Sequence, residues 1–303
     1  MKRKYDIDES LQPWSSFVPP FNPTAFHLAR RIAGIWRDVR EDEGMKVIKL
    51  NIPKDGGGAI RAILYAPRLA RQACSAVLLL HGGGFCYPAA PQHYRLAKEL
   101  VRSLDAAVLL VDYSLGPEAI YPEPENECVQ AFDWLVSEAE TLNIDPERIA
   151  VLGDSAGGYL ALELVDRLRR ADVKPCFSML LYPVVSAAMD TSSMLEFDDT
   201  PMWNSDLNAR MWQYHLGGRV IETIGQRPSL VGFPLAYIEV CQFDCLHDEG
   251  VKLAETLRES RVPVAMIDIP RAMHGFDIRG KSPLVKEAMA RRIAALRSAF
   301  DRN

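Results

Sequence analysis

The sequence contains 303 residues, of which 48% are hydrophobic and 25% are charged. A chain of this length and composition is long enough to bury a sizeable core, as one large domain or two ordinary ones. Its formal net charge of -5 offers no basic surface for nucleic acid or for an anionic membrane. We therefore expect a small-molecule partner, and neither nucleic acid nor a membrane.

The chain shows no targeting, membrane-spanning or metal-binding pattern. Its basic start is followed by no apolar run, and nowhere do about 18 apolar residues occur together, so we expect a cytoplasmic protein. The six cysteines are scattered, and no second pair at ligand spacing accompanies Cys241 and Cys245. Buried thiols are therefore expected rather than disulfides, and no metal is expected.

Residues 1–43 are predicted to form an N-terminal cap segment. Proline and aromatic residues crowd its first part, and from Thr24 to Trp36 apolar residues recur with a helical period. Residues 45–52 and 59–65 then alternate apolar and polar on either side of three consecutive glycines. This pattern predicts an antiparallel hairpin at the edge of a sheet.

From residue 75 the pattern changes to continuous apolar runs separated by helical stretches, which is typical of a parallel sheet covered on both faces. We expect strands at 76–80, 106–113, 148–153, 177–185, 235–243 and 262–269. We expect helices at 94–103, 126–142, 155–170, 249–259 and 284–300. With the hairpin, residues 44–303 form a mostly parallel sheet of about eight strands flanked by helices, the α/β-hydrolase fold.

A segment at about residues 186–232 is longer than a crossover between strands needs. Four of the five tryptophans lie either here or in the N-terminal piece, namely Trp14, Trp36, Trp203 and Trp212. We expect the two segments to form one apolar helical cap over the carboxyl ends of the strands, where ligands bind in open α/β sheets. The alternative is that these aromatic residues only anchor two surface helices.

The candidate nucleophile is Ser155. It lies in a G-x-S-x-G pattern, Gly153 to Gly157, between an apolar β-branched run and a stretch of helical period. In this strand-turn-helix context the pattern indicates a nucleophile elbow, a strained turn that lifts a serine hydroxyl above the sheet. A turn of small residues without chemistry is the alternative, against which the strand before it and the helix after it argue.

A serine hydroxyl needs a base to remove its proton and a carboxylate to orient that base. His274 follows the last predicted strand by a short loop, and Asp244 follows the strand before it. These are the candidate base and acid, in the order that this fold requires. Asp248 is the alternative acid, although Asp248 and Glu249 also suit the first turn of the next helix.

The oxyanion of the reaction needs hydrogen-bond donors. Three consecutive glycines, Gly82 to Gly84, directly follow the strand at 76–80, and glycines let backbone N–H groups converge on one point. With the N–H of Ala156, the residue after the nucleophile, they would complete an oxyanion hole. A phosphate cradle is a weaker interpretation, because neither nucleotide-binding glycine pattern is present.

Four motifs together resemble the hormone-sensitive-lipase-like family of α/β-hydrolase carboxylesterases. They are His81-Gly-Gly-Gly-Phe85, Gly153-Asp-Ser-Ala-Gly-Gly158, Asp244-x-Leu-x-Asp-Glu-Gly250 and His274-Gly-Phe276. The resemblance covers about residues 45–300. It implies Ser155 as nucleophile, His274 as base and then acid, Asp244 as its orienting carboxylate, and Gly83, Gly84 and Ala156 as oxyanion donors. It also implies that His81 braces the glycine loop.

The sequence departs from the family pattern in two places. Where the family often has Asp-Tyr-Arg-Leu-Ala-Pro-Glu, this chain has Ser114 for the arginine and Gly116 for the alanine. Cys245 replaces the usual proline after the triad aspartate. Neither departure removes a chemical group from the mechanism, but both affect the expected geometry of the pocket.

The resemblance implies a cofactor-independent hydrolase of small esters with short acyl groups, acetyl to butyryl. Phe85 and Tyr87 beside the glycine loop, and Trp203 and Trp212 in the cap, are the candidate substrate-binding residues. The same chemistry on an amide or peptide, or deacetylation of a carbohydrate, is the alternative, because fold and triad do not choose a substrate. A non-catalytic binding protein is disfavoured because all three triad members are present. Proteins of this family commonly form homodimers that pair through the last strand or the last helix.

Overall fold

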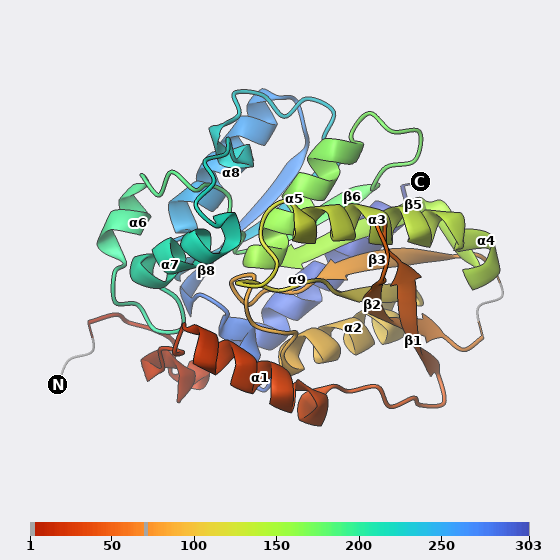
Figure 1. The fold of residues 1–303 in the computed structure, drawn as a ribbon, viewed down its shortest axis with the longest axis horizontal. Coiled ribbons are helices and arrows are strands. Elements are labelled where there is room, and N and C mark those ends of the chain that lie inside the picture. Colours follow the sequence, from red (N-terminus) through yellow and green to blue (C-terminus); the bar gives the residue numbers. More distant parts are fainter. Residues whose placement is uncertain (1–3, 70–71, 303) are drawn as a thin grey trace.

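The computed structural model describes residues 4–69 and 72–302. Its centre is an eight-stranded sheet with the order β1-β2-β4-β3-β5-β6-β7-β8 (Figure 1). The strands are β1 (Met45–Pro53), β2 (Ala59–Pro67), β3 (Cys74–Leu80), β4 (Ala107–Asp112), β5 (Ile144–Asp154), β6 (Phe177–Leu181), β7 (Leu235–Phe243) and β8 (Val264–Met273). β1 and β2 form an antiparallel hairpin at one edge, β2 is antiparallel to β4, and the other neighbours are parallel. The predicted α/β-hydrolase fold is confirmed.

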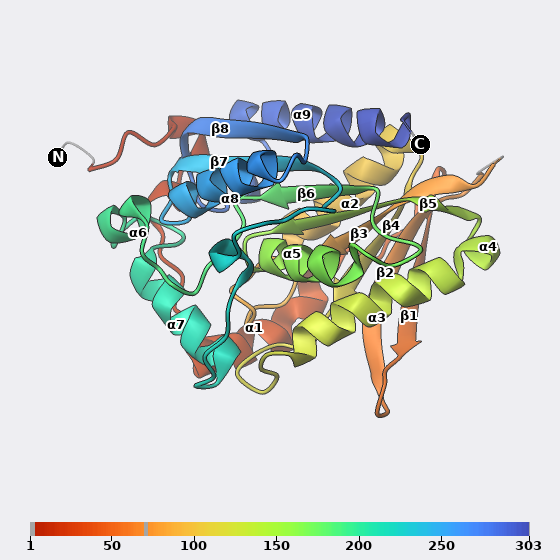
Figure 2. The same ribbon diagram turned by 90° about the horizontal axis from the view of Figure 1, so that it is seen from above.

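Helices cover both faces of the sheet. The helices are α1 (Pro23–Trp36), α2 (Pro91–Leu104), α3 (Glu123–Ser137), α4 (Ala139–Leu142), α5 (Ala156–Leu168), α6 (Ser192–Glu196), α7 (Ser205–Leu216), α8 (His247–Glu259) and α9 (Pro283–Phe300). Figure 2 shows α9 on one side of the sheet and α3 and α5 on the other. Successive β3 side chains enter opposite cores: Val77 and Leu79 pack with α2 and α9, Leu78 and Leu80 with α3, α5 and α8. Burial on both faces explains why the central strands are continuously apolar.

The boundaries of several elements differ from the prediction. β6 ends at Leu181 rather than at 185, because the next residue, Tyr182, has a φ of 36° and turns the chain out of the sheet. β5 begins at Ile144 rather than at 148, because that residue pairs with Cys74 before a bulge. The helix predicted at 126–142 divides into α3 and α4 at Glu138. Each difference arises from backbone geometry that an apolar pattern does not report.

The N-terminal segment and the insertion after β6 contact each other. The N–H of Met202 donates to the carbonyl oxygen of Phe17 at 2.7 Å, and the ring of Phe21 packs edge-on against Trp203 at 5.3 Å between centroids. The insertion carries α6 and α7, of which α7 lies near α1 in Figures 1 and 2. Both segments therefore meet at the end of the sheet where β3, β5 and β8 lead into the candidate site. That they close over substrate as a cap stays a prediction.

Within the described residues, no helix combines the length and apolar character needed to cross a bilayer. None of the six cysteines, all of which lie in the described ranges, forms a disulfide. Cys86, Cys128, Cys241 and Cys245 are buried, and the other two are partly buried. The expectation of thiols in place of a disulfide framework agrees with this arrangement.

Candidate active site

Ser155 lies in the sharp turn between β5, which ends at Asp154, and α5, which begins at Ala156. Its φ of 53° and ψ of -122° are strained for a residue with a side chain. The glycines around it are required by space, since a Cβ atom at Gly153 would collide with the carbonyl of Gly157, and one at Gly157 with the carbonyl of Leu80. The turn is therefore a nucleophile elbow in geometry as well as in sequence.

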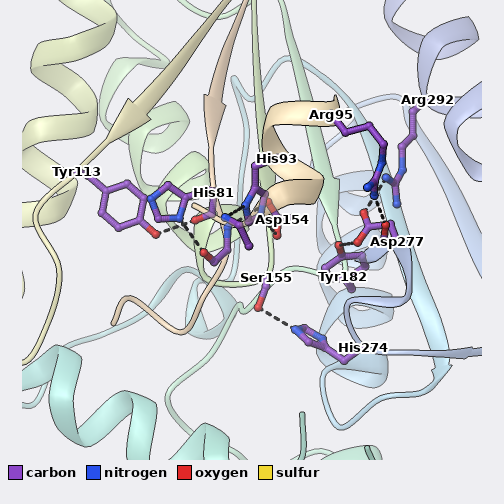
Figure 3. Close-up of polar contacts among 12 residues, drawn as sticks. His81, His93, Arg95, Tyr113, Asp154, Ser155, Tyr182, His274, Asp277 and Arg292 are labelled. Atoms are coloured by element: carbon purple, nitrogen blue, oxygen red, sulfur yellow. Dashed lines mark hydrogen bonds and ion pairs between the residues drawn. The ribbon is translucent and has the colours of Figure 1, made fainter. Parts of the chain in front are cut away.

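Three side chains from separate loops form a line of hydrogen bonds. The Oγ atom of Ser155 is 2.8 Å from Nε2 of His274, and Nδ1 of His274 is 2.7 Å from Oδ2 of Asp244. Figure 3 shows the contact between the serine and the histidine. All three residues are buried, and Asp244 is completely so. Since the Nδ1 proton is held by the carboxylate, Nε2 is left to accept the serine proton.

The alternative acid, Asp248, has a different place. It lies in the first turn of α8, where Oδ2 accepts the N–H of Ser193 at 2.9 Å and Oδ1 contacts His247. Glu249, the next residue, accepts the N–H of Val185 at 2.9 Å, and burial raises its pKa to about 8. The structure thus brings Asp244, and not Asp248, to the histidine, and places both later carboxylates at the helix N-terminus as the sequence suggested.

The glycine loop after β3 presents free backbone donors beside Ser155. Gly83 and Gly84 have φ values of 123° and 58°, and a Cβ atom at Gly83 would lie 2.8 Å from the carbonyl oxygen of Tyr87. Within the described part of the chain, neither N–H is used in a hydrogen bond, whereas that of Gly82 donates to Asp154. Two N–H groups without a hydrogen-bond partner among the described residues, beside a serine hydroxyl, suit the binding of an oxyanion.

A buried pair of side chains holds this loop. Asp154 accepts the N–H of Gly82 through Oδ1 at 3.0 Å and contacts Nε2 of His93 through Oδ2 at 3.1 Å. His93 in turn accepts the N–H of Ala90 on Nδ1 at 2.8 Å, so its proton lies on Nε2 and points at the carboxylate. Burial opposes the charge on Asp154, but His93 and the hydrogen bonds outweigh it and lower the pKa of Asp154.

His81 supports the loop from the other side. Its Nδ1 lies 2.7 Å from the carbonyl oxygen of Gly82, and its ring stacks on that of Tyr113 with centroids 4.4 Å apart. The hydroxyl of Tyr113 donates to the carbonyl of His81 at 2.7 Å (Figure 3). The sequence did not reveal that His93 supports the glycine loop, because an isolated histidine at the start of a helix belongs to no pattern. Asp154, in contrast, lies inside the serine motif and could have been singled out.

A cavity of about 310 Å³ opens above Ser155. Its wall is largely aromatic, with side chains from the N-terminal segment, the glycine loop and the insertion: Trp14, Phe17, Trp36, Tyr87, Tyr182 and Trp203. Among the described residues, no group of three or more histidine, cysteine, aspartate and glutamate side chains is arranged to hold a metal ion. The site therefore combines the hydrogen-bonded line of Ser155, His274 and Asp244 with the glycine loop and an apolar chamber.

Two of the four predicted substrate-binding residues line this cavity and two do not. Tyr87 and Trp203 belong to its wall. Phe85 is fully buried and stacks on His215 with centroids 3.8 Å apart, while Trp212 packs edge-on against Tyr159 at 5.2 Å. Phe85 and Trp212 therefore pack in the core beneath the insertion and not in the cavity wall, and a contact of either residue with substrate stays a prediction.

The comparisons with known proteins agree with this geometry. A family model described as the alpha/beta hydrolase fold matches residues 77–278, which include the glycine loop and all three members of the hydrogen-bonded line. The chain belongs to the hormone-sensitive-lipase-like family of α/β-hydrolase carboxylesterases.

Several relatives of this carboxylesterase are named as esterases or ester hydrolases. Carboxylesterase NlhH of Mycobacterium tuberculosis is 30% identical over 266 residues, covering 84% of this chain and 83% of its own. Ethyl acetate hydrolase of Pseudomonas putida is 30% identical over 260 residues, covering 82% and 80%. Among solved structures, a bacterial heroin esterase superposes with a TM-score of 0.89 at 28% identity, covering 97% of this chain and 98% of its own.

The carboxylesterase replaces the arginine that its family often has at position 114. Ser114 donates instead to Glu127 through both its N–H and its hydroxyl, at 2.6 and 2.7 Å. Arg30 of α1 donates to Glu118 at 2.6 Å and to the carbonyl of Cys86 at 3.1 Å, and it also reaches the carbonyl of Gly116. An arginine from the N-terminal segment thus ties this loop to the end of the glycine loop.

Proposed function

We propose that this carboxylesterase hydrolyses small esters with short acyl groups, from acetyl to butyryl, by way of an acyl-enzyme on Ser155. The observation that carries the proposal is the continuous line from Ser155 through His274 to Asp244, beside the glycine loop that lines the same cavity. The proposed reaction requires no metal and no organic cofactor.

In the first half-reaction, His274 removes the proton of Ser155 while Oγ attacks the ester carbonyl carbon. The carbonyl oxygen becomes an oxyanion, which the N–H groups of Gly83, Gly84 and Ala156 stabilise. His274 then gives its proton to the leaving alkoxide, and the alcohol departs. In the second half-reaction, His274 takes a proton from water, hydroxide oxygen attacks the acyl-enzyme, and the acid leaves as Ser155 regains its proton.

The small acyl group is supported by the size and lining of the site. The cavity of about 310 Å³ is bounded by large rings, including Trp203, whose ring centroid lies 5.9 Å from that of His274. A pocket bounded by large aromatic rings close to the reacting atoms favours a short chain there. The relative named ethyl acetate hydrolase carries an acetyl ester in its name.

The alternative substrates are amides, peptides and acetylated carbohydrates. A relative named arylacetamide deacetylase from Oryctolagus cuniculus is 25% identical over 265 residues. Amides, peptides and acetylated carbohydrates require the same nucleophile, base and oxyanion donors. Matched ester, anilide and sugar-acetate substrates with the same acetyl group would separate these classes, and we expect the ester to be hydrolysed fastest.

The test of the proposal is hydrolysis of p-nitrophenyl acetate and butyrate by purified protein. We expect activity that Ser155→Ala and His274→Ala abolish. Asp244→Asn and Asp248→Asn form a matched pair, since each removes one carboxylate from the stretch between β7 and the first turn of α8, but of the two only Asp244 contacts His274. Loss in the first variant and retention in the second is expected. Folded wild-type protein that leaves both esters untouched would contradict the proposal.

Two further expectations concern the protein outside its site. A homodimer through β8 or α9 and a cytoplasmic location stay predictions. Sedimentation at several concentrations would test the first, and cell fractionation would test the second.

A further inference from the structure

One arginine side chain is fully buried in the core behind the site. Arg292 lies on α9 and is the largest side chain with almost no exposed surface. A buried guanidinium is costly unless charges and hydrogen bonds compensate it. Arg292 donates to Glu239 through Nε at 3.2 Å and through Nη2, and to Oδ2 of Asp277 through Nη1 at 2.9 Å.

Two tyrosine hydroxyls complete this network. Tyr237 donates to Oε2 of Glu239 at 3.0 Å, and Tyr182 donates to Oδ1 of Asp277 at 2.7 Å. All four carboxylate oxygens are therefore paired with donors. Burial opposes the charge on Arg292, but the two carboxylates outweigh it and raise its pKa. The network is thus a fully satisfied ionic cluster with defined geometry.

The network reaches His274 by two routes. Along the chain, Asp277 is three residues beyond His274, in the same turn. Through space, the ring of Tyr182 packs edge-on against the imidazole, with centroids 4.9 Å apart, and also lines the cavity. Figure 3 shows Tyr182, Asp277 and Arg292 joined to one another beside His274.

The backbone of Tyr182 needs such support. Its φ of 36° lies in the left-handed region, and its N–H donates to the carbonyl of Glu239 at 2.6 Å. Both its hydroxyl and its N–H are therefore held by residues bound to Arg292. The same cluster therefore holds Tyr182 against the imidazole of His274 at its hydroxyl and at its backbone N–H.

We propose that Arg292 and Asp277 are positioning residues, which hold Tyr182 against His274 and so keep the imidazole aligned with Ser155. The inference rests on the proposed role of His274 as base. If the cluster contributed only to stability, its replacement would leave kcat of the folded protein unchanged, because a buried ion pair with no other role can be replaced without loss of function.

Tyr182→Phe is the most direct variant, because it keeps the ring beside His274 and removes only the hydroxyl that bonds Asp277. Tyr237→Phe is its matched control: it removes the equivalent hydroxyl from the other carboxylate, at a residue that does not line the cavity. We expect Tyr182→Phe to lower kcat about tenfold and to leave KM within about twofold of wild type, since a small misalignment of a general base slows the reaction strongly. We expect Tyr237→Phe to lower stability only.

Arginine variants supply a second pair. Arg292→Met removes the centre of the cluster, whereas Arg291→Met, at the neighbouring position on α9, removes a partly exposed side chain that pairs with Glu287. Active protein is counted by stoichiometric labelling with a serine-directed phosphonate, so that unfolded molecules do not lower kcat. We expect a larger loss of kcat in Arg292→Met than in Tyr182→Phe and none in Arg291→Met.

A readout without substrate separates this inference from the proposed function. The downfield proton resonance of Nδ1 in the pair of His274 and Asp244, assigned by its absence in His274→Asn, reports the alignment of the imidazole directly. We expect it to shift or broaden in Tyr182→Phe and to stay in place in Tyr237→Phe. A wild-type protein without esterase activity would contradict the proposed function, whereas a folded Tyr182→Phe with an unchanged resonance or unchanged kcat would overturn the positioning role.

Discussion

The carboxylate of Asp154 accepts the backbone N–H of Gly82 at 3.0 Å, which joins the residue before the nucleophile to the first glycine of the oxyanion loop. The contact is close, since a Cβ atom at Gly82 would collide with the other oxygen of Asp154. The turn that presents Ser155 and the glycine loop beside it are therefore joined by one side chain.

His93→Leu should weaken this arrangement. It removes the hydrogen bond to Asp154 and leaves the N–H of Ala90 unpaired at the far end of the glycine loop. We expect kcat for p-nitrophenyl acetate to fall about tenfold, because displaced donors stabilise the oxyanion less. His27→Leu, which changes an exposed histidine of α1, is the control and should keep wild-type kcat. Equal kcat in the two variants would argue against the support.

Gly83→Ala should nearly abolish activity. Its φ of 123° is unfavourable for alanine, and the new methyl group would meet the carbonyl oxygen of Tyr87. We expect kcat to fall about a hundredfold or more, in line with the loss of one oxyanion donor. Gly56→Ala is the control, because Gly56 also has a positive φ, of 82°, but open space around it. It should cost some stability and no activity.

Glu249→Gln should change how stability depends on pH. The pKa of Glu249 is raised by burial from 4.5 to about 8, so the folded protein keeps a proton that the unfolded chain releases. Its contribution to stability is complete below about pH 4.5 and is lost as the pH rises to about 8. We therefore expect the Tm of wild type minus the Tm of Glu249→Gln to decrease as the pH rises from about 4.5 to about 8.

Glu255→Gln, an exposed position of the same helix, is the control for that experiment and should follow wild type at every pH. Thermal melts in matched buffers provide the measurement. A difference in Tm between wild type and Glu249→Gln that stays constant with pH would show that the buried carboxyl does not titrate in this range.

Trp203→Leu should shift the preference of the protein to esters with a longer acyl chain. Its ring forms part of the cavity wall close to His274, so a smaller side chain leaves room for a longer chain. We expect the optimum in a p-nitrophenyl ester series to move from acetate or butyrate toward hexanoate. Trp212→Leu should lower stability, because Trp212 packs against Tyr159 in the core, but leave the optimum in place. A shift in both variants would contradict the cavity assignment.

Most of the fold follows from patterns that span many residues. The edge hairpin, the parallel strands and the flanking helices all appear in the expected order, because continuous apolar runs and helical periods report burial directly. The ends of elements were harder. The positive φ of Tyr182, which ends β6 early, depends on the contacts that its N–H and hydroxyl make far away in the sequence.

The candidate site divides in the same way. Ser155, Asp244 and His274 stand at strand ends, where the fold gathers them, so motif and order were sufficient to select them. That Phe85 and Trp212 pack away from the cavity wall could not be predicted, because an aromatic residue near a motif gives no sign of which way its ring turns. His93 and Arg292 could not have been found, since neither belongs to a motif, and Asp154 and Glu239, which they contact, are 61 and 53 residues away along the chain.

The central claim is that Ser155 carries the acyl group, and mass spectrometry of the quenched reaction tests it most directly. Wild-type protein mixed with p-nitrophenyl butyrate should release a burst of p-nitrophenol and gain the mass of one butyryl group, located by peptide mapping on Ser155. Ser155→Ala should show neither. A butyryl group on another residue, or turnover of the ester that survives in Ser155→Ala, would contradict the account.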